Sequence, residues 1–136
     1  MRLSLLILAS TYFSVRDILS HRIRNLDLLI FTGIALCISW FSSSDIYPVS
    51  FAVVSLVSIF IAAISGLGMG DVKLVSVFSF FYVPLAVSSY ADLLLGLCIG
   101  SAATLAIGLV RRKSFDFAMP FAPAICFGVI YCASLS

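Results

Sequence analysis

Glutamate is absent from the sequence, histidine occurs once, and charged residues of any kind are rare. Of the 136 residues, 10% are charged and 62% are hydrophobic, and the mean hydropathy is +1.22. A water-soluble domain of this size cannot bury so much apolar surface, so the composition indicates an integral membrane protein. The length suits a single domain, residues 1–136, and the formal net charge of +2 is too small to indicate a nucleic-acid partner.

Motifs for metal or cofactor binding are also lacking. His21 has no second histidine to join it, which disfavours a metal site built with Asp17 and Asp71. The glycine stretch that begins at Gly66 is not a dinucleotide fingerprint, because an aspartate stands where the last glycine is needed. The cysteines lack C-x-x-C spacing and are interpreted as small buried side chains: Cys37, Cys98, Cys126 and Cys132. We therefore expect no metal and no cofactor.

Apolar segments separated by polar or glycine-rich connections predict an all-α polytopic membrane protein with about six spans. The expected spans are residues 3–15, 26–41, 49–65, 72–83, 92–110 and 118–133. A straight crossing needs about 20 residues, so the fit is tight and the fourth span is the least regular. The first segment also fits a signal peptide, but no polar sequence follows it. Gly96 and Gly100 offer a small-residue face for close helix packing.

Basic residues alternate between connections and predict the orientation of the chain. They occur after the first, third and fifth spans: Arg16, Arg22, Arg24, Lys73, Arg111, Arg112 and Lys113. The other two connections contain no lysine or arginine. Under the positive-inside rule the three basic connections are cytoplasmic, and both termini then lie outside the cytoplasm. Arg2 is the one exception to this pattern.

Because glutamate is absent, every side-chain carboxylate is an aspartate, and two of these lie at the predicted cytoplasmic face. Asp17 and Asp71 each adjoin the end of a span, and an acid inside a membrane costs at least about 2.5 kcal/mol, which indicates a function. Two carboxyls in a partly dry site share one proton. The ionised one can activate water while the protonated one polarises a carbonyl, which is the chemistry of aspartyl proteolysis. The glycines before Asp71 allow the backbone to leave helical geometry and accept an extended peptide.

These residues carry a resemblance to a known family. The run Gly68-Met69-Gly70-Asp71-Val72-Lys73 resembles the G-x-G-D-x-K signature of the type IV prepilin peptidases, membrane aspartyl proteases of the GxGD class. Residues 17–25 resemble the family's other acid motif, with Ile23 and Asn25 in register and Arg24 where proline is expected. Residues 119–123 are similar to the Pro-Phe-x-Pro segment that opens the family's last helix. The three motifs keep the family's order.

The resemblance implies an aspartyl endopeptidase that cleaves prepilin or pseudopilin precursors just before their apolar N-terminal helix. It implies that Asp17 and Asp71 are the catalytic pair and that Gly68, Gly70 and Lys73 form a supporting loop. The partners would be the precursor and the lipid bilayer, with the active site on the cytoplasmic face of the inner membrane. The connection after the first span is only about ten residues long. The chain therefore resembles the short form, which lacks the cysteine-rich insert that accompanies methyl transfer.

Other interpretations stay open at this point. Asp27 fits the start of the second helix, and Asp45 and Asp92 fit caps or first turns on the outer face. Asp116 fits a counter-charge for the nearby basic cluster and is the next candidate if a catalytic assignment fails. A small proton-coupled transporter or channel subunit would also keep intramembrane acids, although near the middle of the membrane. A noncatalytic subunit of a pilus or secretion assembly is a third possibility.

Overall fold

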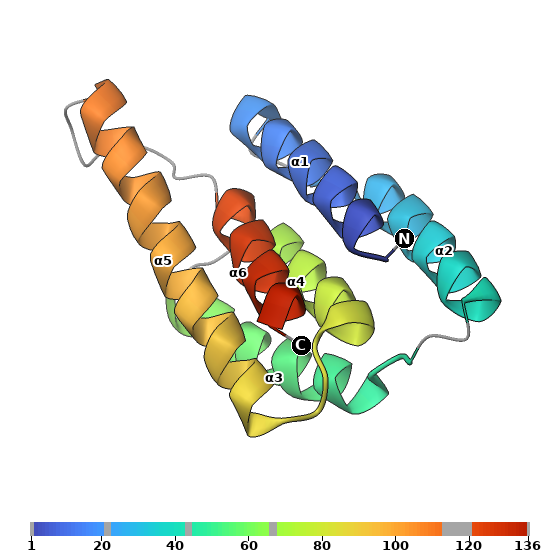
Figure 1. Ribbon diagram of the computed structural model, residues 1–136. Coiled ribbons are helices and arrows are strands. Elements are labelled where there is room, and N and C mark those ends of the chain that lie inside the picture. The colour runs from blue at the N-terminus through green and yellow to red at the C-terminus, as the bar shows by residue number, and fades with distance from the viewer. Residues whose placement is uncertain (1, 21–22, 43–44, 66–67, 113–120, 136) are drawn as a thin grey trace.

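The computed structural model describes residues 2–20, 23–42, 45–65, 68–112 and 121–135. Six helices account for most of these residues, and no strand occurs among them (Figure 1). The helices are α1 (Arg2–Ser20), α2 (Asn25–Phe41), α3 (Pro48–Ser65), α4 (Met69–Tyr82), α5 (Val87–Arg112) and α6 (Ala122–Leu135). The prediction of an all-α fold is confirmed.

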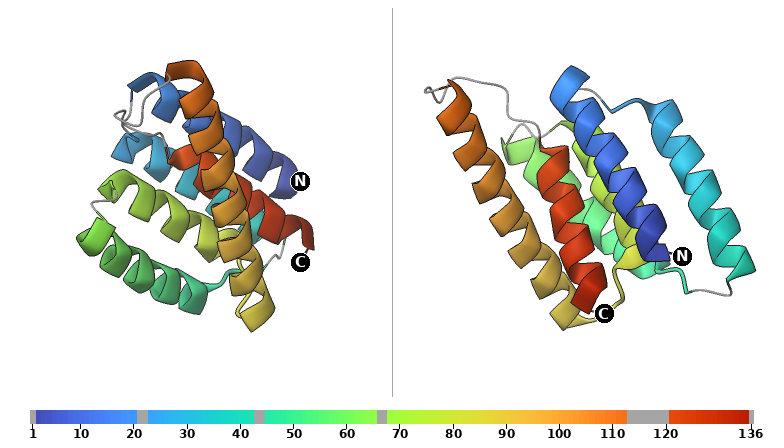
Figure 2. Two further views of the ribbon diagram at one scale, coloured as in Figure 1. Left: turned by 90° about the vertical axis from the view of Figure 1, so that its left-hand side faces the viewer. Right: turned by 45° about the horizontal axis from the view of Figure 1, so that its top comes forward.

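Helix α6 is central in the bundle. It packs against α5 on one side and against α1 and α4 on the other, as the two further views in Figure 2 also show. Helix α3 packs against α4, and α2 lies at an edge against α1 and α4. Helices α1, α3 and α5 end at one end of the bundle, where α2, α4 and α6 begin (Figure 2). We call this end the site end.

Two helical segments in the described part of the chain are long and apolar enough to cross a membrane, Leu3–Ser20 and Val87–Gly108. Shorter apolar helices are Asn25–Phe41, Pro48–Ile64 and Ala122–Leu135. These segments indicate that the protein associates with a membrane. Helix α4 is different, since most of its side chains from Val72 onward are buried inside the bundle. Six complete spans and the orientation of the termini remain predictions.

Four predicted helix boundaries were wrong, and polar partners explain one of them. Helix α6 begins at Ala122 and not at residue 118, because Phe121 is not helical. Helix α1 continues to Ser20 instead of ending at residue 15, because Arg16 and Asp17 both find partners on other helices. Helix α4 begins at Met69, so the signature glycines are closer to the helix than predicted. Helix α5 begins at Val87, which places Asp92 beyond the first turn and not at a cap.

An aromatic cluster attaches α2 to the rest of the bundle. The rings of Phe13 on α1, Phe31 on α2 and Phe78 on α4 meet edge to face, with centroids 5.2 to 6.1 Å apart. All three side chains are buried, and Phe13 and Phe78 are almost completely enclosed. Edge-to-face pairs of this kind are each worth about 0.5–1.5 kcal/mol beyond their buried area. The cluster therefore holds together three of the helices that supply the site described below.

Close packing of α5 on α6 confirms the small-residue face predicted at Gly96 and Gly100. A Cβ atom added to Gly96 would lie 2.7 Å from the Cα of Gly128, and one added to Gly100 would lie 2.9 Å from the Cα of Ala124. Real Cβ atoms essentially never approach another carbon so closely. The two backbones can touch only because these positions carry no side chain.

Candidate active site

Asp17 lies in the last turn of α1, and its side chain is held by the start of α6. The residue is only 6% exposed. Its Oδ2 accepts the backbone N–H of Ala122 at 3.0 Å. The first N–H groups of a helix have no partner within the helix, and they carry partial positive charge. Asp17 therefore accepts a hydrogen bond from one of these donors. The segment that resembles the Pro-Phe-x-Pro motif contributes this backbone N–H, from Ala122.

Asp71 lies in the first turn of α4, where a negative side chain suits the helix dipole. Its N–H donates to the carbonyl of Gly68 at 3.0 Å. Gly68 precedes the helix with extended backbone, φ −63° and ψ 136°. A Cβ atom at Gly68 would lie 3.2 Å from Oδ2 of Asp71, which is tighter than ordinary contact. Glycine at this position therefore leaves room for the Asp71 carboxylate.

Gly70 differs from the prediction that it shapes a loop, because it lies inside the first turn of α4. A Cβ atom at Gly70 would lie 3.4 Å from the Cβ of Ile23, which is at the limit of ordinary contact. Because Gly70 has no side chain, Ile23 in the segment before α2 can lie close to the start of α4. The predicted supporting loop is reduced, among the described residues, to the turn at Gly68.

The two carboxyls line one cavity at the site end, with a volume of about 440 Å³. The other lining residues come from the segments before and at the starts of α2 and α4: Ile23, Arg24, Asn25, Gly68, Met69 and Gly70. Asp71 precedes the fourth predicted span, and burial raises its pKa from the ordinary 3.8 to about 6, with a further contribution from the charge of Asp17. The cavity therefore holds two carboxyls that influence each other, one of which keeps its proton at mildly acidic pH.

A second link between these segments involves Lys73, which the family resemblance assigned to the supporting loop. Its Nζ donates to Oδ1 of Asn25 at 3.1 Å. Asn25 opens α2 and Lys73 lies in the first turns of α4. Both side chains are exposed. Lys73 therefore joins the two family-like motifs to each other and makes no ion pair with Asp71.

We expect Asn25→Ala and Lys73→Met each to lower the free energy of unfolding by about 0.5–1 kcal/mol, because an exposed charged hydrogen bond is weak. The two effects should not add, since either change removes the same bond. Reversible unfolding of the two single variants and the double variant in mixed micelles measures this coupling. Lys73→Arg, which keeps the charge and the donor, is the control, and additive effects would contradict the link.

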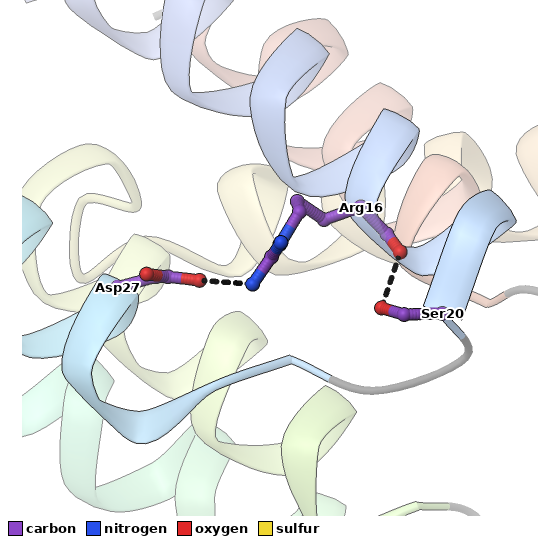
Figure 3. Close-up of polar contacts among 3 residues, drawn as sticks. All are labelled: Arg16, Ser20 and Asp27. Atoms are coloured by element: carbon purple, nitrogen blue, oxygen red, sulfur yellow. Dashed lines mark hydrogen bonds and ion pairs between the residues drawn. The ribbon is translucent and has the colours of Figure 1, made fainter.

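Arg16 and Asp27 form a third connection, between the end of α1 and the start of α2. The guanidinium Nη2 of Arg16 lies 3.4 Å from Oδ2 of Asp27, and Ser20 Oγ donates to the Arg16 carbonyl at 2.8 Å (Figure 3). Asp27 lies in the first turn of α2, as predicted. Arg16 is thus directed to α2, and Asp17 makes no ion pair with its neighbour in the chain.

Sequence reasoning missed two groups at this site. The N–H of Ala122 is a backbone atom, and only the Pro-Phe-x-Pro resemblance pointed to its segment. Asn25 was noted for its register with Asp17, but its contact with Lys73 needs the folded chain. Several predicted residues lie outside the described residues: His21, Arg22, Gly66, Lys113 and Asp116.

In the part of the chain that the structure describes, no group of three or more histidine, cysteine or acidic side chains is placed to hold a metal ion. The groups at the candidate site are the carboxyls of Asp17 and Asp71, the N–H of Ala122, and the side chains of Arg24 and Lys73. No protein-family model, curated protein or solved structure matches this chain.

Proposed function

We propose that this chain is an aspartyl endopeptidase that removes the leader of prepilin-like precursors. The observation that carries the proposal is the shared cavity of Asp17 and Asp71, two carboxyls brought together from α1 and α4. The raised pKa of Asp71 supports it, because one member of an aspartyl pair must hold a proton while the other is ionised. The segments that resemble the two acid motifs of the type IV prepilin peptidases line this same cavity.

In this mechanism Asp17 is the base and Asp71 is the acid. Asp17 takes a proton from a water molecule, whose oxygen attacks the carbonyl carbon of the scissile peptide bond. Asp71 gives its proton to the carbonyl oxygen, which stabilises the tetrahedral intermediate. When the intermediate collapses, the C–N bond breaks, the amine takes the proton held by Asp17, and Asp71 recovers its proton. The N–H of Ala122 supports this role for Asp17, because such a donor stabilises a carboxylate through the reaction.

The location follows from the proposed topology of a multi-pass inner-membrane protein. Arg16, Arg24 and Lys73 lie at the site end, and under the positive-inside rule a basic end is cytoplasmic, so we infer that the cavity faces the cytoplasm. A precursor whose apolar segment lies in the bilayer would present its leader at that depth. A transporter is less well supported, because Asp17 and Asp71 occupy the last turn and the first turn of their helices and not the middle.

Cleavage of a reporter tests the proposal. The reporter carries a short polar leader followed by an apolar segment of about 20 residues, and it is mixed with the purified protein in lipid vesicles. The expected product begins at the leader boundary, as mass spectrometry of the new N-terminus would show. A protein that leaves a series of such precursors intact, but moves protons across the same vesicles, would contradict the peptidase and support the transporter.

The rate of cleavage is expected to fall as the pH rises above about 6. The active form has Asp71 protonated, and burial raises the pKa of this carboxyl to about 6. Above that value the protonated fraction, and with it kcat/KM, decreases about tenfold per pH unit. Initial rates at low reporter concentration between about pH 5 and pH 8 measure this dependence. A rate that rises with pH throughout the range would contradict the role of Asp71 as the acid.

A further inference from the structure

Arg24 is the position at which residues 17–25 depart from the family's acid motif, and it lines the cavity with Asp17 and Asp71. Its backbone is extended, φ −76° and ψ 134°, and it precedes the first residue of α2. The Arg24 carbonyl accepts the N–H of Leu28 at 3.3 Å. This backbone geometry is one that proline also adopts. The replacement of proline by arginine therefore adds a charged side chain without requiring a different start for the helix.

The guanidinium of Arg24 has no partner among the described residues. The neighbouring cations are engaged elsewhere, Arg16 with Asp27 and Lys73 with Asn25. Arg24 makes no comparable hydrogen bond or ion pair in the described part of the chain, and its side chain is exposed. Arg24 therefore lines the cavity without a side-chain partner among the described residues, and the other charged lining residues are Asp17 and Asp71.

We propose that Arg24 is a specificity-determining residue that binds a carboxylate side chain of the peptide substrate close to the scissile bond. This inference rests on the proposed peptidase function. A guanidinium presents paired N–H donors that match a carboxylate, and the bond is charge-assisted. An acidic substrate side chain elsewhere in the cavity would face Asp17 and Asp71 and be repelled. This repulsion is avoided only if the peptide binds with its acidic side chain beside Arg24.

The size of the cavity limits where the substrate acid can lie. An extended peptide advances about 3.3 Å per residue, so about three residues span a cavity of this volume. The acidic side chain is therefore expected within about three residues of the scissile bond. A lipid phosphate is disfavoured as the ligand, because a headgroup held at Arg24 would obstruct the cavity that the peptide must enter.

The test uses the vesicle assay with reporters that carry one glutamate at each position within about three residues of the scissile bond, matched to glutamine at the same position. The parent is expected to cleave the glutamate reporter about tenfold faster at one or two adjacent positions. Arg24→Gln should bring this ratio to about one, and Arg24→Lys should keep part of it. Arg24→Glu should reverse the preference, in favour of lysine at that position. The vesicles contain phosphatidylcholine alone, so anionic headgroups are absent.

The outcomes separate this inference from the proposed function. Equal cleavage of glutamate and glutamine reporters by the parent overturns the inference alone, as does a ratio unchanged in Arg24→Gln. Anionic lipid that speeds cleavage of the glutamate and glutamine reporters equally, with the effect lost in Arg24→Gln, assigns Arg24 to a headgroup and overturns it too. If Arg24→Glu lowers cleavage of every reporter by the same factor, the guanidinium acts on the acid pair and not on the substrate. A parent that cleaves no reporter overturns the peptidase itself.

Discussion

Asp17→Asn is expected to lower the rate of leader cleavage at least about 100-fold while the folded fraction stays close to that of the parent, since a general base contributes about 10²–10⁴. Asparagine has the same size as aspartate, and its amide oxygen can still accept the N–H of Ala122. It cannot take a proton from water. The loss should therefore affect the chemical step and not the packing of α1 on α6. Initial rates in vesicles, at matched protein levels, measure it.

Asp71→Asn should give a loss of similar size, and the double variant should be little worse than either single one, because the two carboxyls act as a unit. The matched control is Asp27→Asn, which removes a carboxyl from the same end of the bundle but not from the cavity lining. Its ion pair with Arg16 is partly exposed, so we expect the control to retain most of its activity. Parent-like cleavage by both Asp17→Asn and Asp71→Asn would show that the assignment is wrong, and Asp116 would then be tested.

Gly96→Leu is expected to lower the free energy of unfolding by about 3 kcal/mol, the upper end of the range for overpacked cores. The first atom added at Gly96 would lie 2.7 Å from the Cα of Gly128 and 3.1 Å from its carbonyl oxygen. These are backbone atoms, so no side-chain rotation can relieve the contact. Helices α5 and α6 must separate, and the separation should also displace Ala122 from Asp17 and slow cleavage.

Gly33→Leu is the matched control for this substitution, because a Cβ atom at Gly33 would meet nothing within 4 Å. It should leave stability unchanged or slightly raised, since glycine is about 1 kcal/mol less favourable than alanine in a helix. A thiol-reactive dye reports unfolding on heating in detergent, because Cys126 and Cys132 are buried inside the bundle. Cys37 and Cys98 were wrongly predicted to be buried; they are exposed, and their reaction before heating sets the baseline. Equal transition temperatures for the two leucine variants would contradict the close packing of α5 on α6.

The presence of the helices could be predicted from the sequence more accurately than the residues at which they begin and end. Apolar runs identify α2 and α3 to within one residue at each end, because a serine or a proline marks the change. Charge was a poor guide to the end of α1. Arg16 and Asp17 suggested that the helix had reached water, whereas each is satisfied by a partner from another helix. Partners of this kind depend on tertiary structure, and no local pattern contains them.

In the candidate site too, the acidic side chains could be predicted from the sequence, but their partners on other helices could not. The pairing of Asp17 with Asp71 was predicted from topology and from motif resemblance, and the structure places both in one cavity. The hydrogen bond from the N–H of Ala122 in α6 to Asp17 was not predicted, because nearly every residue carries a backbone N–H and the residue type gives no indication of its partner. The partner of Lys73 was not predicted either, since Asn25 is 48 positions away in the chain. Both contacts arise only once the helices pack.

The hydrogen bond from Ala122 to Asp17 joins the first helix of the bundle to the last, across 105 positions of sequence. During synthesis the earlier helices emerge and insert first, and domains fold in that order. Until α6 arrives, Asp17 lacks its backbone donor and the side of α1 that α6 covers is open. A nascent chain would therefore carry both acids without the complete site, and the proposed peptidase activity would begin only after α6 has packed against α1.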